Sequence, residues 1–94
     1  MPENVKVSAL PTRPPATWAA NTAFDARAYP DVEFQFTSGT VTVTRSLDGT
    51  NYVTWWTMDK DFAFASSAAT PGIYSTQGSA WLKFSADVTV RAGS

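Results

Sequence analysis

The chain has 94 residues, of which 44% are hydrophobic, and seven basic against eight acidic side chains give a formal net charge of −1. This length suits one domain with a single core. Neither sign of charge is clustered, so the field needed to capture a polyphosphate is missing and nucleic acid is not expected as a partner. Histidine and cysteine are absent, which removes the commonest general base, the thiol nucleophile and the usual zinc ligands. We therefore expect no enzyme, no cofactor and no metal.

Membrane and secretion signals are not apparent in the sequence. No apolar run approaches the length of a membrane span, and residues 1–4 lack the basic and apolar regions of a signal peptide. We expect a protein that is made in the cytoplasm, is soluble there and has no membrane partner. A net charge so close to zero leaves little repulsion between copies, which favours a homo-oligomer.

The chain opens with a predicted edge strand and a proline-rich arm. Apolar and polar residues alternate over 5–9, and Pro11 ends this short strand. Residues 10–15 contain three prolines, each of which fixes φ and removes a backbone donor. We expect residues 1–17 to form an extended arm and residues 18–94 to form the folded domain. The arm lies either across its own domain or on a neighbouring subunit.

A β-hairpin from Thr40 to Trp56 is the strongest local signal. Val41 and Val43 alternate with threonines in the first arm, and Asp48-Gly49 supplies the turn. Before it, an irregular stretch over 18–29 is followed by a strictly alternating strand over 32–37. Because only a short turn separates this strand from the hairpin, the three strands are expected to form a meander.

The rest of the chain adds a surface loop over 66–72 and further short strands at 73–75, 80–84 and 87–91. Alternation directs Leu82, Phe84, Val88 and Val90 inward, and the pair Phe62 and Phe64 is also expected in the core. The total is seven or eight short strands with no helix of convincing length. We predict an all-β fold, a single antiparallel β-sandwich of jelly-roll or immunoglobulin-like type, since a sheet with one apolar face must cover that face.

Two carboxylates, Asp59 and Asp61, form the closest acidic pair, and residues two apart on a strand point the same way. They invite comparison with an acid and base pair or, with Asp48, with a Ca²⁺ site. A solvated loop is the simpler interpretation, because the pair flanks a lysine and its spacing matches no calcium loop.

The four tryptophans are the stronger functional lead. Trp55 and Trp56 are consecutive, so in a strand they point to opposite faces and only one of them can enter the core. Trp81 raises the same question, because it sits opposite Leu82 and Phe84. Three roles stay open for an outward tryptophan: a protein interface, a partly exposed edge of the core, or a platform on which a sugar ring stacks.

Two segments carry a resemblance to a protein family. Residues 42–52, Thr-Val-Thr-Arg-Ser-Leu-Asp-Gly-Thr-Asn-Tyr, are followed about thirty residues later by 78–84, Gly-Ser-Ala-Trp-Leu-Lys-Phe, and by a terminal Val-Thr-Val at 88–90. This arrangement resembles small β-sandwich virion proteins of tailed bacteriophages, over roughly half the chain. Residues 1–39 match no pattern of that family.

The resemblance implies a virion structural protein without enzymatic activity, a capsid decoration or cement protein or a minor head or tail component. The implied partners are the major capsid protein and further copies of this chain, and the implied location is the capsid surface. Decoration proteins resemble one another in bridging subunits with extended arms, which fits the proline-rich segment. The residues expected at the interface are Pro11, Arg13, Pro14, Pro15, Trp18, Trp55, Trp56 and Trp81. The alternative is a carbohydrate-binding or receptor-adsorption module that uses Trp18, Trp56 or Trp81.

Overall fold

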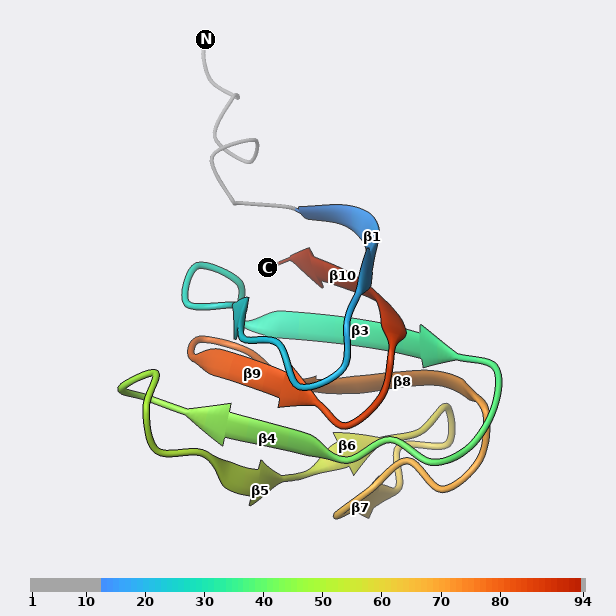
Figure 1. Cartoon of the computed structure of the whole chain (residues 1–94). Helices are drawn as coiled ribbons and strands as arrows, with labels where there is room; N and C mark the ends of the chain where they lie inside the picture. Colours follow the sequence, from blue (N-terminus) through green and yellow to red (C-terminus); the bar gives the residue numbers. More distant parts are fainter. Residues whose placement is uncertain (1–12, 94) are drawn as a thin grey trace, which may run out of the picture.

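A computed structural model describes residues 13–93, which form ten β-strands in two antiparallel sheets (Figure 1). The strands are β1 Arg13–Trp18, β2 Phe24–Asp25, β3 Asp31–Phe36, β4 Val43–Ser46, β5 Val53–Trp55, β6 Thr57–Met58, β7 Phe64–Ala65, β8 Gly72–Gln77, β9 Trp81–Phe84 and β10 Val88–Gly93. Within this range there is no helix long and apolar enough to cross a membrane.

The six-stranded sheet has the order β1-β10-β3-β8-β6-β7, and the four-stranded sheet has the order β2-β9-β4-β5. The predicted all-β fold with two antiparallel sheets is therefore confirmed, and the arrangement is that of a β-sandwich. The strands outnumber the seven or eight expected because β2 and β6 have two residues each, too few for alternation to reveal them. One of these, β2, lies in the stretch expected to be irregular.

The core lies between the facing sides of the two sheets. Phe34 and Val90 reach it from the six-stranded sheet, and Val43, Leu82 and Phe84 reach it from the four-stranded sheet. The rings of Phe34 and Phe84 meet across the layers with centroids 5.2 Å apart. Each fully buried side chain of this size contributes about 1.5–3 kcal/mol. The inward directions predicted for residues 32–36, 82–84 and 88–90 are confirmed by their burial.

The predicted hairpin forms β4 and β5, in which Val43 pairs with Trp55. Gly49 takes the turn with φ of +78°, a conformation that glycine adopts at little cost. The Asp48 carboxylate accepts hydrogen bonds from the backbone N–H groups of Asn51 and Thr50, each at 2.8 Å, and from the Ser46 hydroxyl at 2.7 Å. These bonds favour the ionised form and hold the pKa of the Asp48 carboxyl well below its usual range.

The expected three-stranded meander is wrong, because β3 and β4 belong to different sheets. The neighbours of β3 are β10 and β8. Both β3 and β4 carry one apolar face, and these faces cover each other across the core rather than lying side by side. Residues 37–42 carry the chain from one sheet to the other, where the Thr42 N–H donates to the Ser85 hydroxyl at 2.8 Å.

Residues 13–18, assigned from the sequence mostly to the arm, form the edge strand β1 that pairs with β10. Arg13 aligns with Ala92 and Ala16 with Val90, so β1 has one extra residue in a bulge that contains Pro14 and Pro15. Prolines lack the N–H that a ladder needs, and edges and bulges are where sheets accept them. The strand predicted over 5–9 and Pro11 lie outside the described residues.

Candidate binding surface

Trp55 and Trp56 mark the point at which the chain passes from the four-stranded to the six-stranded sheet. Trp55 packs against the core beside Val43, and the Arg45 guanidinium lies 4.8 Å from the centre of its ring. Trp56 lies on the opposite side and lines a groove on the outer face of the six-stranded sheet. One ring thus faces the core and the other faces outward, as expected, although Trp56 lies between β5 and β6 rather than in one strand with Trp55.

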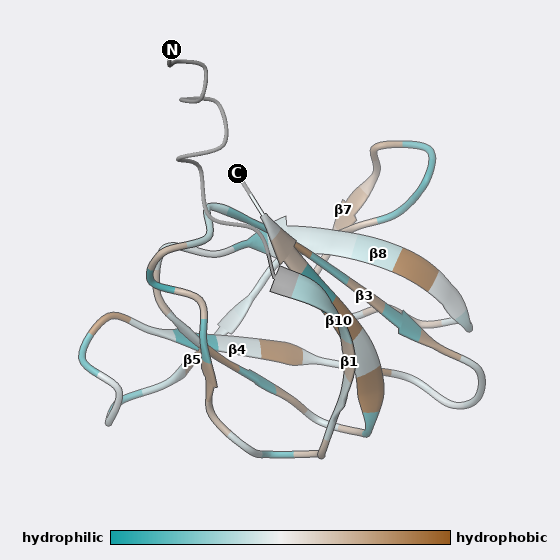
Figure 2. Cartoon of the chain, turned by 90° about the horizontal axis from the view of Figure 1, so that it is seen from above, coloured by the Kyte–Doolittle hydropathy of each residue, from teal (hydrophilic) through white to brown (hydrophobic). Residues whose placement is uncertain are grey.

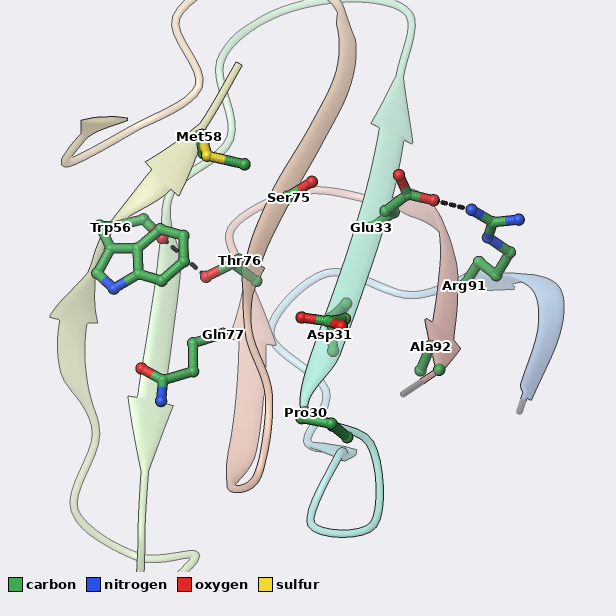
Figure 3. Close-up of a pocket in the computed structure, with 12 residues that line it drawn as sticks. Pro30, Asp31, Glu33, Trp56, Met58, Ser75, Thr76, Gln77, Arg91 and Ala92 are labelled. Carbon is green, nitrogen blue, oxygen red and sulfur yellow. Dashed lines mark hydrogen bonds and ion pairs between the residues drawn. The ribbon is translucent and has the colours of Figure 1, made fainter. Parts of the chain in front are cut away.

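The groove is built from outward-pointing residues that the strand register places in two rows. In the first row, Met58 of β6 pairs with Ser75 of β8, Ser75 with Glu33 of β3, and Glu33 with Arg91 of β10. Figure 3 shows these four side chains in sequence across the sheet. The Glu33 carboxylate and the Arg91 guanidinium form an ion pair, so the charge of the arginine is matched within the groove.

The second row lies two residues along each strand. Gln77 pairs with Asp31, and Asp31 pairs with Gly93. Continuing the register of β6 by two residues brings Trp56 beside Gln77, and Figure 3 shows the indole there with its ring face turned toward the viewer. The row thus runs from an aromatic ring through an amide and a carboxylate to a glycine. Because Gly93 has no side chain, no side chain stands above the sheet at that end of the row.

Trp56 is held firmly in this position. Its carbonyl oxygen accepts a hydrogen bond of 2.7 Å from the hydroxyl of Thr76, a residue that points into the core. Its indole meets the ring of Phe64 edge to face, with centroids 5.0 Å apart and an angle of 88° between the planes. The platform is therefore anchored through both its backbone and its ring.

Two polar side chains of the groove are unengaged. The Asp31 carboxylate and the Gln77 amide make no hydrogen bond to any residue in the range 13–93, and both residues are exposed. One supplies two acceptors and the other supplies a donor and an acceptor. Their hydrogen-bonding capacity faces solvent beside the ring of Trp56.

A tight turn between β6 and β7 forms a second feature. The Phe62 N–H donates to the Asp59 carbonyl at 3.0 Å, and the Asp59 carboxylate accepts from the N–H groups of Asp61 and Ala63 at 2.8 and 3.0 Å. Phe62 has φ of +63°, in the left-handed region where turns usually place glycine or asparagine. Figure 2 shows this turn standing out beside β7.

The prediction that Phe62 and Phe64 belong to the core is wrong: their exposed fractions are 75% and 65%. Phe64 pairs with Met58 and therefore shares the outer face of the sheet, while Phe62 sits in the turn beyond the end of the strand. The alternation of residues 62–65 was that of a half-buried strand, but β7 is the last strand of its sheet and has only two residues. We call Phe62 and Phe64 the hairpin aromatics.

On the outer face of the four-stranded sheet, positively charged side chains lie over the aromatic rings. The Arg27 guanidinium lies 4.3 Å from the centre of the Trp81 ring, and it is ion-paired with Asp25 at 2.9 Å. The Lys83 ammonium lies 4.4 Å from the centre of the Tyr52 ring. These contacts cover ring faces that a ligand would need, so Trp81 is a poorer platform than Trp56.

The residues expected at an interface lie in separate places. Trp18 is half-buried, meets Phe24 edge to face at 5.0 Å and donates its indole N–H to the Thr22 carbonyl at 2.8 Å. Pro14 and Pro15 are exposed on the edge strand, in which Arg13 also lies. Trp55 points inward and Trp81 lies under Arg27, whereas Trp56 lines a groove together with further polar groups of the described residues.

The carboxylates singled out in the sequence shape turns. Asp48 and Asp59 each accept two backbone hydrogen bonds, and Asp61 pairs with Lys60 at 3.1 Å on the surface. Among the described residues no group of three or more acidic side chains is arranged to hold a metal ion. The solvated-loop interpretation accounts for the geometry of all three.

Comparisons of the chain with known protein families, with characterised proteins and with solved structures found no match. Sequence reasoning named Trp56 but missed its neighbours in the groove. Alternation did mark Glu33 and Arg91 as outward, yet only the strand order β10-β3-β8-β6 shows that they share one surface.

Proposed function

We propose that this protein is a non-enzymatic phage virion protein, a capsid decoration protein that docks on the shell through the hairpin aromatics. The observation that carries the proposal is Phe62, a large apolar side chain that is 75% exposed at a left-handed backbone position. A left-handed conformation costs an L-residue roughly 1–2 kcal/mol, and glycine or asparagine would avoid this cost. A phenylalanine at this point therefore sacrifices stability of the isolated chain.

Burial of the hairpin aromatics on docking would supply free energy that offsets the backbone cost of Phe62. Full burial of a phenylalanine side chain contributes about 1.5–3 kcal/mol, so burying both hairpin aromatics outweighs the backbone cost of Phe62. Such aromatic anchors at the centre of a contact are typical of residues that dominate binding energy. Repetition over many copies on a shell multiplies a modest contribution from each copy.

The choice of a phage shell as the partner rests on the resemblance of residues 42–52 and 78–84 to small virion sandwiches, which are of jelly-roll or immunoglobulin-like type. Under this proposal the partners are the major capsid protein and neighbouring copies of the chain. Residues 1–12, with the proline-rich segment that begins before β1, extend the contact to an adjacent subunit. The charge of −1 is compatible with close packing of copies.

Co-sedimentation with purified shells that lack the protein tests the docking surface. We expect Phe62→Asn combined with Phe64→Ser to weaken shell binding at least tenfold. The matched control is Leu47→Ser, which removes another exposed apolar side chain in the β4–β5 loop, at the opposite end of the molecule (Figure 1). Full-strength binding by the double variant, or an equal loss in the control, would contradict the proposal.

Deleting residues 1–12 tests the arm separately. This deletion stops before Arg13 and leaves the pairing of β1 with β10 intact, so the sandwich is expected to remain folded. Shell binding is expected to fall, because the bridge to the adjacent subunit is lost. Unchanged binding by the shortened chain would remove the arm from the docking surface while leaving the hairpin aromatics untouched.

A further inference from the structure

We infer that the groove on the outer face of the six-stranded sheet binds a neutral carbohydrate chain, with Trp56 as the stacking platform and Gln77 and Asp31 as the hydrogen-bonding groups. This inference goes beyond docking on a shell, because the groove lies on β10, β3, β8 and β6 rather than at the β6–β7 turn. A decoration protein with this groove would display a sugar-binding site on the particle.

The arrangement of Trp56 is that of a platform for a sugar ring. The C–H groups on one face of a pyranose pack on an aromatic plane, while its hydroxyls need donors and acceptors beside that plane. The register places Gln77 one strand from Trp56 and Asp31 two strands from it, which is about 10 Å at the usual spacing between strands. A chain lying across the strands would stack one unit on the indole and present further hydroxyls to the amide and the carboxylate.

The site is formed before a ligand arrives. The bond from the Thr76 hydroxyl to the Trp56 carbonyl and the edge contact with Phe64 fix the platform. Gln77 and Asp31 lie in strands whose neighbours on both sides are paired. Binding therefore orders few groups of the protein, which lowers its entropic cost.

Charge selects a neutral ligand. Asp31 and Glu33 place two carboxylates in the groove, and among the described side chains that line it the one arginine, Arg91, is already paired with Glu33. A phosphate, sulfate or uronate would meet an uncompensated negative charge at Asp31. Neutral hydroxyls instead donate hydrogen bonds to that carboxylate, which are stronger than bonds to an uncharged acceptor.

Other occupants fit the groove less well. An added peptide strand would need a free sheet edge, but the groove lies over strands already paired on both sides. A divalent cation would need more oxygen ligands than Asp31 offers, given that Glu33 is engaged by Arg91. An apolar helix would bury Gln77 and Asp31 without hydrogen bonds, which carries a desolvation cost.

The test is titration of the full chain with defined oligosaccharides, followed by tryptophan fluorescence and by amide shifts in two-dimensional NMR spectra. The neutral probes are the hexasaccharides of maltose, cellulose, chitin and mannan types, and the acidic probes are oligogalacturonate and a heparin hexasaccharide. We expect saturable binding of at least one neutral probe, with amide shifts at Gln77 and Asp31, and at least tenfold weaker binding of the acidic probes.

Variants then assign the site. Trp56→Ala is expected to weaken binding at least tenfold, whereas Trp56→Phe retains part of it because a ring is kept. Since Trp56→Ala also removes a contact with Phe64, the decisive variant is Gln77→Ala, because Gln77 is exposed and its replacement is expected to leave the fold intact. Its matched control is Gln35→Ala. Gln35 is an exposed glutamine of β3 on the same outer face of the six-stranded sheet, but it lies outside the groove.

No saturable binding of any neutral probe would overturn the inference, and so would equal effects of Gln77→Ala and Gln35→Ala. Neither result bears on shell docking, which depends on Phe62 and Phe64. Conversely, loss of shell binding in the single variant Phe62→Asn, which keeps the contact between Phe64 and Trp56, with unchanged sugar binding would show that the two surfaces act independently. Stronger binding of the acidic probes than of the neutral ones would also contradict the assigned chemistry.

Discussion

The rings of Trp56 and Phe64 meet edge to face, with centroids 5.0 Å apart and planes at 88°. This contact joins the groove to the β6–β7 turn, because one ring lines the groove and the other is one of the two hairpin aromatics. A partner that buries Phe64 would therefore contact the ring that also buttresses Trp56. The two proposed surfaces are adjacent but are built from different side chains.

Removing that buttress should loosen the platform. We expect Phe64→Ala to lower the free energy of unfolding by about 0.5–1.5 kcal/mol, the usual contribution of such a ring pair. Tryptophan fluorescence anisotropy should fall as Trp56 gains freedom. Ile73→Ala serves as the control, since it removes an exposed apolar side chain from the same outer face without touching the ring pair. An unchanged anisotropy in Phe64→Ala would show that the Thr76 hydrogen bond alone holds the indole.

Because Phe62 has a left-handed backbone conformation, we expect a variant that relieves its cost to be more stable while binding the shell less well. Phe62→Asn should raise the free energy of unfolding by about 1 kcal/mol, because asparagine tolerates this conformation. Phe62→Ala loses the same ring but keeps the backbone cost, so it should give no such gain. Urea denaturation of both variants separates the two effects. If both variants have the stability of the natural chain, the left-handed conformation at Phe62 does not lower the free energy of unfolding.

Sequence reasoning reached the strands that alternate over four or more residues, namely β3, β4, β9 and β10, and it placed their core residues correctly. It failed where the alternation of apolar residues does not show the position of a segment within the sheet. Phe62 and Phe64 alternate like core residues, yet Phe62 lies in the β6–β7 turn and Phe64 lies in β7, the two-residue strand at the edge of the sheet. The groove was out of reach because its rows combine β6, β8, β3 and β10, and the order of strands in a sheet is set by packing between distant segments.

Position 78 requires glycine because the backbone of residues 29–30 passes close to it. A Cβ at this position would lie 1.8 Å from the Tyr29 carbonyl oxygen, and the Gly78 N–H donates to the Pro30 carbonyl at 2.8 Å. Gly78→Ala must push these backbones apart, and we expect a loss of about 3 kcal/mol in unfolding free energy. Gly93→Ala, where a Cβ meets nothing within 4 Å, should change stability by less than about 1 kcal/mol. Equal denaturation midpoints for the two variants would refute this explanation.

The Asp48 loop predicts a loss of stability in acid. The pKa of the Asp48 carboxyl is lowered by the N–H groups of Asn51 and Thr50 and by the Ser46 hydroxyl. Its stabilising contribution is therefore complete above the unfolded value of about 3.9 and is lost as the pH falls below it, toward the folded pKa. Asp48→Asn should be less stable than the natural chain near neutral pH, and the difference should shrink below about pH 4.

Asp61→Asn is the control for this pH dependence. The Asp61 side chain contacts the exposed Lys60 and accepts no backbone hydrogen bond from the described residues. Its replacement should leave the dependence of stability on pH as it is in the natural chain. A constant difference between the natural chain and Asp48→Asn across the acid range would contradict the assigned role of the loop.

Copy number in the particle tests the proposed function most directly. Under the proposed function, quantitative mass spectrometry of particles purified from the source of the chain would give its ratio to the major capsid protein. We predict a near-stoichiometric ratio, as a decoration protein repeated over the shell requires. A ratio of a few copies per particle would move the protein to the tail or neck, and its absence from the particle would contradict a virion role altogether.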